Sequence, residues 1–153
     1  MSRTPDCDGS PPMAMHSVSV GGVVVDDHQR VLVIKRGDNG RLATPGGVLE
    51  RDEAPCDGLR REVWEETGIP IDSGHLTGVY KNMRTGVLSL VFRCAALAGA
   101  ALVPSAETPE VMWLPFTDAL RLAHPVYAIR ISDAFRPDGP FVRLHNGHQL
   151  LVG

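Results

Sequence analysis

The sequence predicts one mixed α/β domain, in which helical segments interrupt a series of strands. The chain has 153 residues, enough for one domain that buries about two-thirds of its unfolded surface. Hydrophobic residues make up 43% and charged residues 22% of the chain, which is ordinary for a globular protein. Apolar and alternating runs typical of strands lie on both sides of one segment with helical spacing.

Composition excludes several classes of protein. The formal net charge of −3 gives no indication of a basic surface for nucleic acid. No apolar run approaches the roughly 20 residues of a membrane span, and the first residues do not resemble a secretory leader. Cys7, Cys56 and Cys94 have neither disulfide nor zinc spacing. We therefore expect a cytoplasmic protein with no membrane partner.

The N-terminal part of the chain predicts a tail followed by a hairpin. Residues 1–15 are rich in Pro, Gly, Ser and Asp, a composition typical of a mobile tail. Residues 16–153 are then expected to form the single domain. Residues 16–25 alternate and then run apolar, and residues 31–35 are apolar again. With a polar turn between them, these runs predict two paired strands.

The middle of the chain predicts a short strand, a sharp turn and a helix. Residues 42–44 read as a strand that ends at the Pro-Gly-Gly of residues 45–47, where the glycines allow close approach to a ligand. Pro55 suits the first turn of a helix and Gly68 suits its end. Gly58 lowers the stability of this helix by about 1 kcal/mol relative to alanine. Either this glycine allows the close approach of a neighbouring loop, or it reflects neutral drift.

The rest of the chain predicts strands, then helices, then a hairpin. Strands are expected at residues 75–81, 88–97 and 110–115, with a loop at 99–109; helices are expected at 118–123 and 125–135. The Asn-Gly of residues 146–147 suits a two-residue type I′ turn between strands at 141–145 and 148–152.

Four glutamates gather in residues 47–69, which read GVLERDEAPCDGLRREVWEETGI. In a helix Glu62 and Glu66 project side by side, with Glu65 close to the same face. Such carboxylates repel each other unless a hard divalent cation lies between them, and Mg²⁺ and Mn²⁺ take oxygen ligands. The pattern therefore predicts a metal site.

Residues 47–69 resemble the complete signature of the Nudix hydrolases, with Gly47, Glu53, Arg61-Glu62, Glu65-Glu66 and Gly68 in their places. The resemblance implies an α/β/α sandwich with a mixed curved sheet. The C-terminal hairpin is additional to that core and is expected to cover a sheet edge or to help form a homodimer. Relatives often carry an aromatic residue where this chain has Leu42.

The resemblance implies metal-dependent hydrolysis of a phosphoanhydride bond in a small nucleotide, a nucleoside diphosphate linked to another moiety. The cofactor would be Mg²⁺ or Mn²⁺. Glu62 and Glu66 are the expected principal ligands, Glu65 shares the ion, and Glu53 joins through water or a second ion. The carbonyl of Gly47 is a further expected ligand, as in some relatives.

Three further roles follow from the resemblance. Arg61 is expected to orient a glutamate of the signature, since Glu65 is four residues further on. The general base is expected to be either Glu65 or another signature glutamate, or a carboxylate outside the signature, with Glu110 preferred over Glu107. Substrate contacts are expected from Arg36 and Arg84, and with less support from Arg130.

Two alternative classes of function remain. A Nudix domain without turnover could bind a nucleotide as a sensor, although such domains usually lose signature glutamates. A purely structural metal site is the other alternative. The sequence does not name the substrate. Most of the histidines are expected at the surface; they are His16, His28, His75, His124, His145 and His148. The aromatic residues Trp64, Tyr80 and Tyr127 could stack on a base but are expected in the core.

Overall fold

The computed structural model describes residues 7–97 and 102–151. In these residues it has three helices, α1 (Pro55–Thr67), α2 (Phe116–Leu122) and α3 (Pro125–Ala134). Its strands are β1 (Val18–Val25), β2 (Arg30–Lys35), β3 (Leu42–Ala43), β4 (Gly46–Val48), β5 (Ile71–Asn82), β6 (Leu88–Ala96), β7 (Glu110–Pro115), β8 (Phe141–His145) and β9 (Leu150–Leu151).

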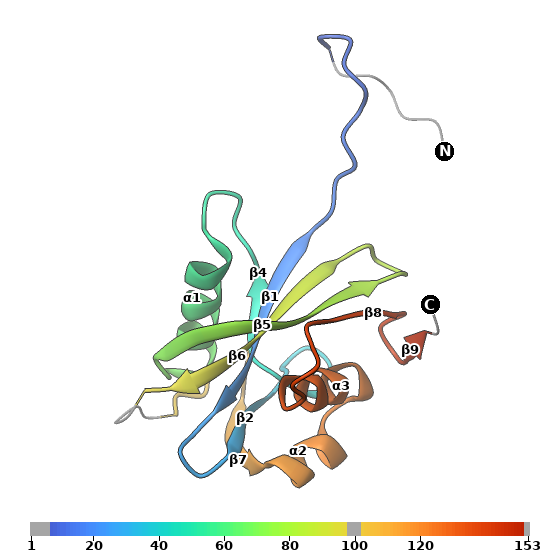
Figure 1. The fold of residues 1–153 in the computed structure, drawn as a ribbon. Coiled ribbons are helices and arrows are strands. Elements are labelled where there is room, and N and C mark those ends of the chain that lie inside the picture. Colours follow the sequence, from blue (N-terminus) through green and yellow to red (C-terminus); the bar gives the residue numbers. More distant parts are fainter. Residues whose placement is uncertain (1–6, 98–101, 152–153) are drawn as a thin grey trace.

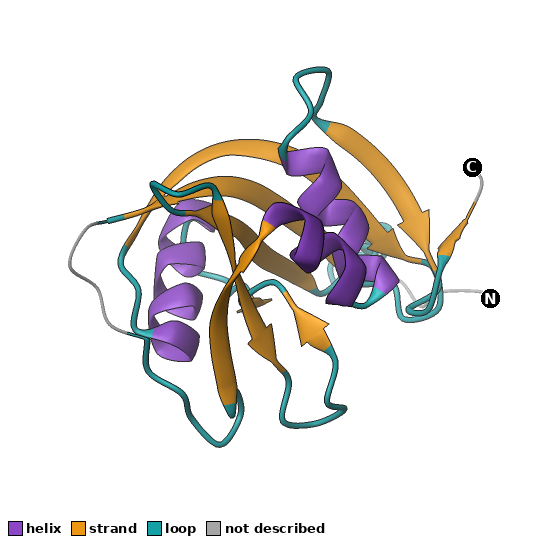
Figure 2. Cartoon of the chain, turned by 90° about the horizontal axis from the view of Figure 1, so that it is seen from below, coloured by secondary structure: helices purple, strands orange, loops and turns teal. Residues whose placement is uncertain are grey.

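The strands form one mixed, curved sheet (Figure 1). Its order is β3-β2-β1-β6-β5-β8-β9, while β4 also pairs with β1 and β7 with β2. The β1–β6 and β5–β8 pairs are parallel and the others antiparallel. Helix α1 lies on one side of the strands, and α2 and α3 lie on the other (Figure 2). The predicted α/β/α sandwich is therefore confirmed.

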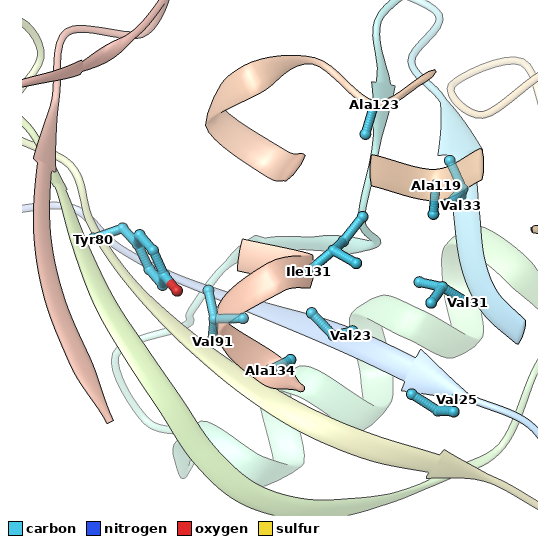
Figure 3. Close-up of a cluster of buried hydrophobic side chains, with 10 residues drawn as sticks. All are labelled: Val23, Val25, Val31, Val33, Tyr80, Val91, Ala119, Ala123, Ile131 and Ala134. Carbon is cyan, nitrogen blue, oxygen red and sulfur yellow. The ribbon is translucent and has the colours of Figure 1, made fainter. Parts of the chain in front are cut away.

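Two buried clusters hold these layers together, because alternate side chains of the central strands point to opposite faces. On the α1 face, Val24 and Leu32 pack with Leu59 and Val63 of the helix. The cluster on the other face is shown in Figure 3, with Tyr80 at one end; it comprises Val23, Val25, Val31, Val33, Tyr80, Val91, Ala119, Ala123, Ile131 and Ala134. Leu42 packs against this second cluster, so an aliphatic side chain is accommodated where relatives often carry an aromatic one.

Strand β4 is a difference from the prediction, which ended a strand at the Pro-Gly-Gly. Gly46 and Gly47 instead pair with β1, opposite Gly21 and Val20. A side chain at Gly46 would collide with the backbone of β1, at the carbonyl oxygen of Val20 and at the Cα of Gly21. Because Gly46 has no side chain, this segment can join the sheet, although its sequence is typical of a turn.

Strand β5 begins at Ile71, four residues before the predicted start. Its first part contains a bulge, with a register shift between Asp72 and His75 and a positive φ of 56° at Gly74. Bulges break the alternation of side chains that identifies a strand, so the sequence pattern hides this part. Helix α2 likewise begins at Phe116, two residues before its predicted start.

The C-terminal hairpin forms, but its predicted two-residue turn is wrong. Leu144 pairs with Leu151 and His145 with Leu150, which leaves a four-residue connection at residues 146–149. The side-chain oxygen of Asn146 accepts hydrogen bonds from the backbone N–H groups of His148 and Gln149 at 3.0 Å each, and this closes the longer turn. Strand β8 pairs with β5 and so covers a sheet edge; the homodimer stays a prediction.

Several expectations concern the ends and the cysteines. Residues 7–17 carry no helix or strand, and the rest of the predicted tail lies outside the described residues, as do residues 99–101 of the predicted loop and Val152. The three cysteines are free, with Cys94 buried. No helix in the described part of the chain has the length and apolar character needed to cross a membrane.

Candidate active site

Helix α1 carries the acidic side chains, and its ends follow from the sequence. Pro55 opens the helix and Gly68 ends it in the left-handed conformation, with φ at 71°. Leu59, Val63 and Thr67 are buried and anchor one side against the sheet. The glutamates of the helix therefore project away from this buried side.

The loop before the helix lies tightly against it at Gly58. A side chain there would approach Leu49 Cδ1 to 2.6 Å and Glu53 Oε1 to 2.8 Å. This close packing favours the first explanation of Gly58, that it admits a neighbouring loop. It also brings Glu53 beside the helix that carries the other glutamates.

Arg61 connects three of the carboxylates. Its guanidinium donates to both oxygens of Glu53, at 2.6 and 3.1 Å, to Glu62 at 2.9 Å and to Glu65 at 3.3 Å. It also reaches the carbonyl oxygen of Val48 at 3.3 Å. The hydrogen bonds from Arg61 hold the pKa of Glu53 at about 2. Arg61 thus contacts all three carboxylates, including Glu65 at the expected four-residue spacing, and its orienting role stays a prediction.

Glu66 and Glu62 lie deeper and are tied to β4. The backbone N–H of Gly46 donates to Glu66 Oε1 at 2.7 Å. Burial raises the pKa of Glu66 to about 7, although the hydrogen bond from Gly46 opposes the shift. Burial also raises the pKa of Glu62, whose carboxylate fills the space where a side chain of Gly47 would lie. The two strand glycines and the two glutamates form one packed unit.

These groups line a cleft of about 890 Å³. Its acidic wall contains Glu62, Glu65 and Glu66 with Gly46 and Gly47. Glu53 and Arg61 are not part of the lining, and Arg61 contacts Glu62 and Glu65 of the wall at 2.9 and 3.3 Å.

The candidate bases outside the signature are placed differently from each other. Glu107 lines the cleft, and its segment is fixed by a hydrogen bond from the N–H of Gly37 to the Glu107 carbonyl at 2.8 Å. Glu110 is exposed at the start of β7, opposite Lys35, and does not line the cleft. The structure therefore brings Glu107 to the acidic side chains and not the preferred Glu110.

The predicted substrate-binding residues both line the cleft. Arg36 already makes an ion pair with Asp38 at 2.8 Å and a hydrogen bond to the hydroxyl of Tyr127 at 3.3 Å. Arg84 donates to the carbonyl oxygen of Asn146 at 3.3 Å. Both are consequently held in place by the protein.

The cleft also contains Arg130, the third expected substrate contact, and two residues that were not expected there. Tyr127, Arg130 and His145 line it, and His145 is an exception to the surface position expected for most of the histidines, since only 5% of it is exposed. The expected core position of Trp64 is also wrong, because 58% of it is exposed. The sequence feature that could have indicated the burial of Arg130 is its position in an amphipathic helix, on the side that faces the sheet.

The donor set fits a hard divalent cation. Glu66 is partly buried and forms no ion pair within the described residues, although the charge of Arg36 lowers its pKa from a greater distance. Carboxylate and carbonyl oxygens are the ligands that Mg²⁺ and Mn²⁺ take. In residues 7–97 and 102–151, no three His, Cys, Asp or Glu side chains already converge as a complete metal site. Arg61 instead holds Glu53 and Glu62.

Comparisons with known proteins identify the family and the fold. The model of the NUDIX domain matches residues 15–135. A MutT-like protein of Streptomyces ambofaciens is 50% identical over 142 residues, which are 93% of this chain and 90% of that protein. An ADP-ribose pyrophosphatase of Methanocaldococcus jannaschii is 36% identical over 90 residues, 54% of this chain and 53% of that protein. A NUDIX hydrolase structure from Nitrosomonas europaea has a TM-score of 0.70 at 21% identity, covering 92% of this chain and 86% of that one.

Proposed function

This chain belongs to the Nudix family of pyrophosphohydrolases, and we propose that it hydrolyses a phosphoanhydride bond in a nucleoside diphosphate linked to another moiety. The observation that carries the proposal is the acidic wall: Glu62, Glu65 and Glu66 lie with Gly46 and Gly47 on one side of a cleft large enough for a small nucleotide. The proposed setting is the reducing cytoplasm, consistent with three free cysteines.

We propose that Glu62 and Glu66 hold Mg²⁺ or Mn²⁺, with Glu65, Glu53 and the Gly47 carbonyl as further ligands. When bound, such an ion neutralises phosphate charge and lowers the pKa of a coordinated water. Arg61 acts as the positioning residue, because it contacts three of these carboxylates at 3.3 Å or less.

The protein must also supply a group that accepts a proton from the attacking water. Glu65 and Glu107 both line the cleft, and Glu65 is the more open of the ion-paired glutamates of α1, with 57% of its side chain exposed against 16% for Glu62. We propose that one of these two glutamates is the general base. Glu110 has weaker support, since it does not line the cleft.

The experiment that tests the proposal is a turnover assay over a panel of nucleotides, with Mg²⁺, with Mn²⁺ and with EDTA. The panel contains nucleoside triphosphates, ADP-ribose, other nucleotide sugars and dinucleoside polyphosphates; ADP-ribose is included because the name of one relative specifies it. We expect metal-dependent cleavage of one member far above the others, with the products identified by mass.

Two alternative results would contradict the proposal. Nucleotide binding without cleavage of any member would favour a sensor. A melting temperature that rises with metal, again without cleavage, would favour a structural metal site.

Replacement of Gly47 by alanine should reduce turnover by about 100-fold, because displacement of a reacting group by about 1 Å has that effect. The new methyl group would occupy the place of the Glu62 carboxylate, and this side chain can move without disturbing the sheet. We therefore expect turnover to fall while the melting temperature, measured by circular dichroism, changes little.

Gly21→Ala is the matched control for Gly47→Ala. Gly21 lies on the neighbouring strand and also lines the cleft, but its new methyl group would meet only ordinary contacts, the nearest at 3.7 Å, and would not displace Glu62. Equal turnover in Gly47→Ala and the natural protein would show that the position of Glu62 against this glycine does not matter for catalysis.

A further inference from the structure

Arg130 is a buried cation for which the described residues provide no anion. Only 8% of it is exposed, and its Nε atom is buried without a hydrogen-bond partner in the described part of the chain. Its guanidinium lies between two rings, 5.0 Å from the centre of Tyr80 and 5.1 Å from that of Tyr127. A buried charge without a counter-ion is costly, so the site is suited to an anion that arrives from outside.

The nearby acid on the same helix does not serve this purpose. Asp133 accepts hydrogen bonds from the Tyr80 hydroxyl at 2.7 Å and from Arg143 at 2.6 and 2.7 Å. Its carboxylate is thereby engaged by other partners. No ion pair joins Arg130 to Asp133 or to any other described residue.

The groups around Arg130 in the cleft are further donors. His145 accepts a hydrogen bond at Nδ1 from the N–H of Gly147 at 3.0 Å, and burial and the charge of Arg130 lower the pKa of His145 to about 4. The imidazole is therefore neutral at pH 7 and carries its proton on Nε2. Asn82 also lines this part of the cleft.

Two more arginines line the same cleft and are held by the hairpin turn. Arg41 donates to the carbonyl oxygen of Gly147 at 3.2 Å, and Arg84 to that of Asn146 at 3.3 Å. Neither forms an ion pair within residues 7–97 and 102–151. The cleft thus combines three arginines without acidic partners with the glutamates of α1.

We propose that Arg130, Arg41, Arg84 and His145 form an anion subsite that binds a second anionic group of the substrate, a phosphate or a carboxylate beyond the bond that is cleaved. This proposal specifies the substrate class of the proposed hydrolase, and it rests on the proposed function. The preferred substrate class is accordingly a nucleotide with an anion at the end held by Arg130. Guanidinium groups suit this role because their N–H groups match phosphate and carboxylate oxygens in pairs.

The binding test uses inorganic phosphate in EDTA, so that it depends on neither metal nor turnover. Phosphate is titrated into the isotope-labelled full chain, and the arginine Nε–H signals are followed by NMR. We expect one of these signals to shift with saturation and to be absent in Arg130→Met. That variant should bind phosphate roughly 10- to 100-fold more weakly, the effect of losing a charge-assisted hydrogen bond.

Arg121→Met is the matched control, because it makes the same change of charge on an arginine with 68% of its side chain exposed. It should bind phosphate as the natural protein does. Equal binding by Arg130→Met and the natural protein, or an equal loss in Arg121→Met, would overturn the proposal. So would a natural protein that does not bind phosphate.

Stability separates a binding role from a structural one. Methionine removes the two contacts of the guanidinium with the tyrosine rings, worth about 1 kcal/mol each, but it also removes a buried charge without an anionic partner, so the melting temperature of Arg130→Met should change little. A clear fall would mean that Arg130 serves the fold, and would contradict the proposal. Arg130→Lys, which keeps the charge but not the planar fork, should bind phosphate with intermediate affinity; affinity as low as that of the methionine variant would also contradict it.

Two pairs of substrates then distinguish the source of the anion. A nucleoside triphosphate is compared with its diphosphate, and UDP-glucuronate with UDP-glucose, which lacks the carboxylate. In one pair we expect a higher kcat/KM for the more anionic member, with that preference lost in Arg130→Met. A preference that survives in both pairs would overturn the inference. Absence of all hydrolysis would refute the proposed function, and the phosphate titration would still decide the subsite.

Discussion

Replacement of Glu62 by glutamine is expected to lower kcat by about 1,000-fold, or roughly 4 kcal/mol, while the fold persists. Glutamine has the same shape but lacks the charge that a divalent cation requires. Its amide oxygen can still accept the hydrogen bond that Arg61 donates to Glu62 at 2.9 Å. The loss should therefore appear in turnover with Mg²⁺ or Mn²⁺ and not in the circular dichroism spectrum.

Glu50→Gln is the control for this prediction, since it makes the same change at an exposed position in the loop before α1. Turnover in that variant should stay close to that of the natural protein. Thermal unfolding with and without Mg²⁺ adds a second measurement: metal should raise the melting temperature of the natural protein more than that of Glu62→Gln. Unchanged turnover in Glu62→Gln would refute the proposed metal site.

Replacement of Asp133 by asparagine is expected to reduce the free energy of unfolding by about 2 to 3 kcal/mol, since the buried Tyr80 hydroxyl and the partly buried Arg143 guanidinium lose a charged acceptor. Asp133 is 1% exposed. Its two oxygens accept hydrogen bonds from Arg143 at 2.6 and 2.7 Å, and one of them also accepts from the Tyr80 hydroxyl. Asparagine would also turn an N–H group toward these donors.

Urea unfolding measures this effect, and Asp138→Asn provides its control. Asp138 makes a similar two-oxygen contact with Arg136, at 2.8 and 3.2 Å, but 58% of its side chain is exposed. Exposed ion pairs contribute less than about 1 kcal/mol, so Asp138→Asn should unfold nearly as the natural protein does. Similar losses in both variants would show that burial does not decide the strength of the Asp133 contact.

The sequence predicts those parts of the fold and site that depend on local spacing. The bounds of β7, β8 and α1 follow from apolar runs, Pro55 and Gly68. The neighbouring positions of Glu62 and Glu66 follow from the period of the helix. The contact between Arg61 and Glu65, at 3.3 Å, has the predicted four-residue spacing. In each case the information lies within one or two turns of the chain.

Other parts depend on segments that meet only in the folded chain. Strand β4 exists because Gly46 can lie against Val20, more than twenty residues earlier. The burial of His145 and Arg130 depends on how β8 and α3 lie on β5. Trp64 is exposed because Leu59, Val63 and Thr67 already occupy the inner side of α1. No local pattern distinguishes these outcomes.

The pairing of β8 with β5 has a consequence for how this protein can change. The hairpin follows the region that matches the NUDIX domain, which ends at residue 135, yet His145 and Gly147 line the same cleft as the glutamates of α1. Alteration of the last fifteen residues can therefore remodel one end of the cleft without touching the acidic wall. In the proposed arrangement the hairpin contributes His145 and the two carbonyl groups that hold Arg41 and Arg84, while the glutamates lie on α1.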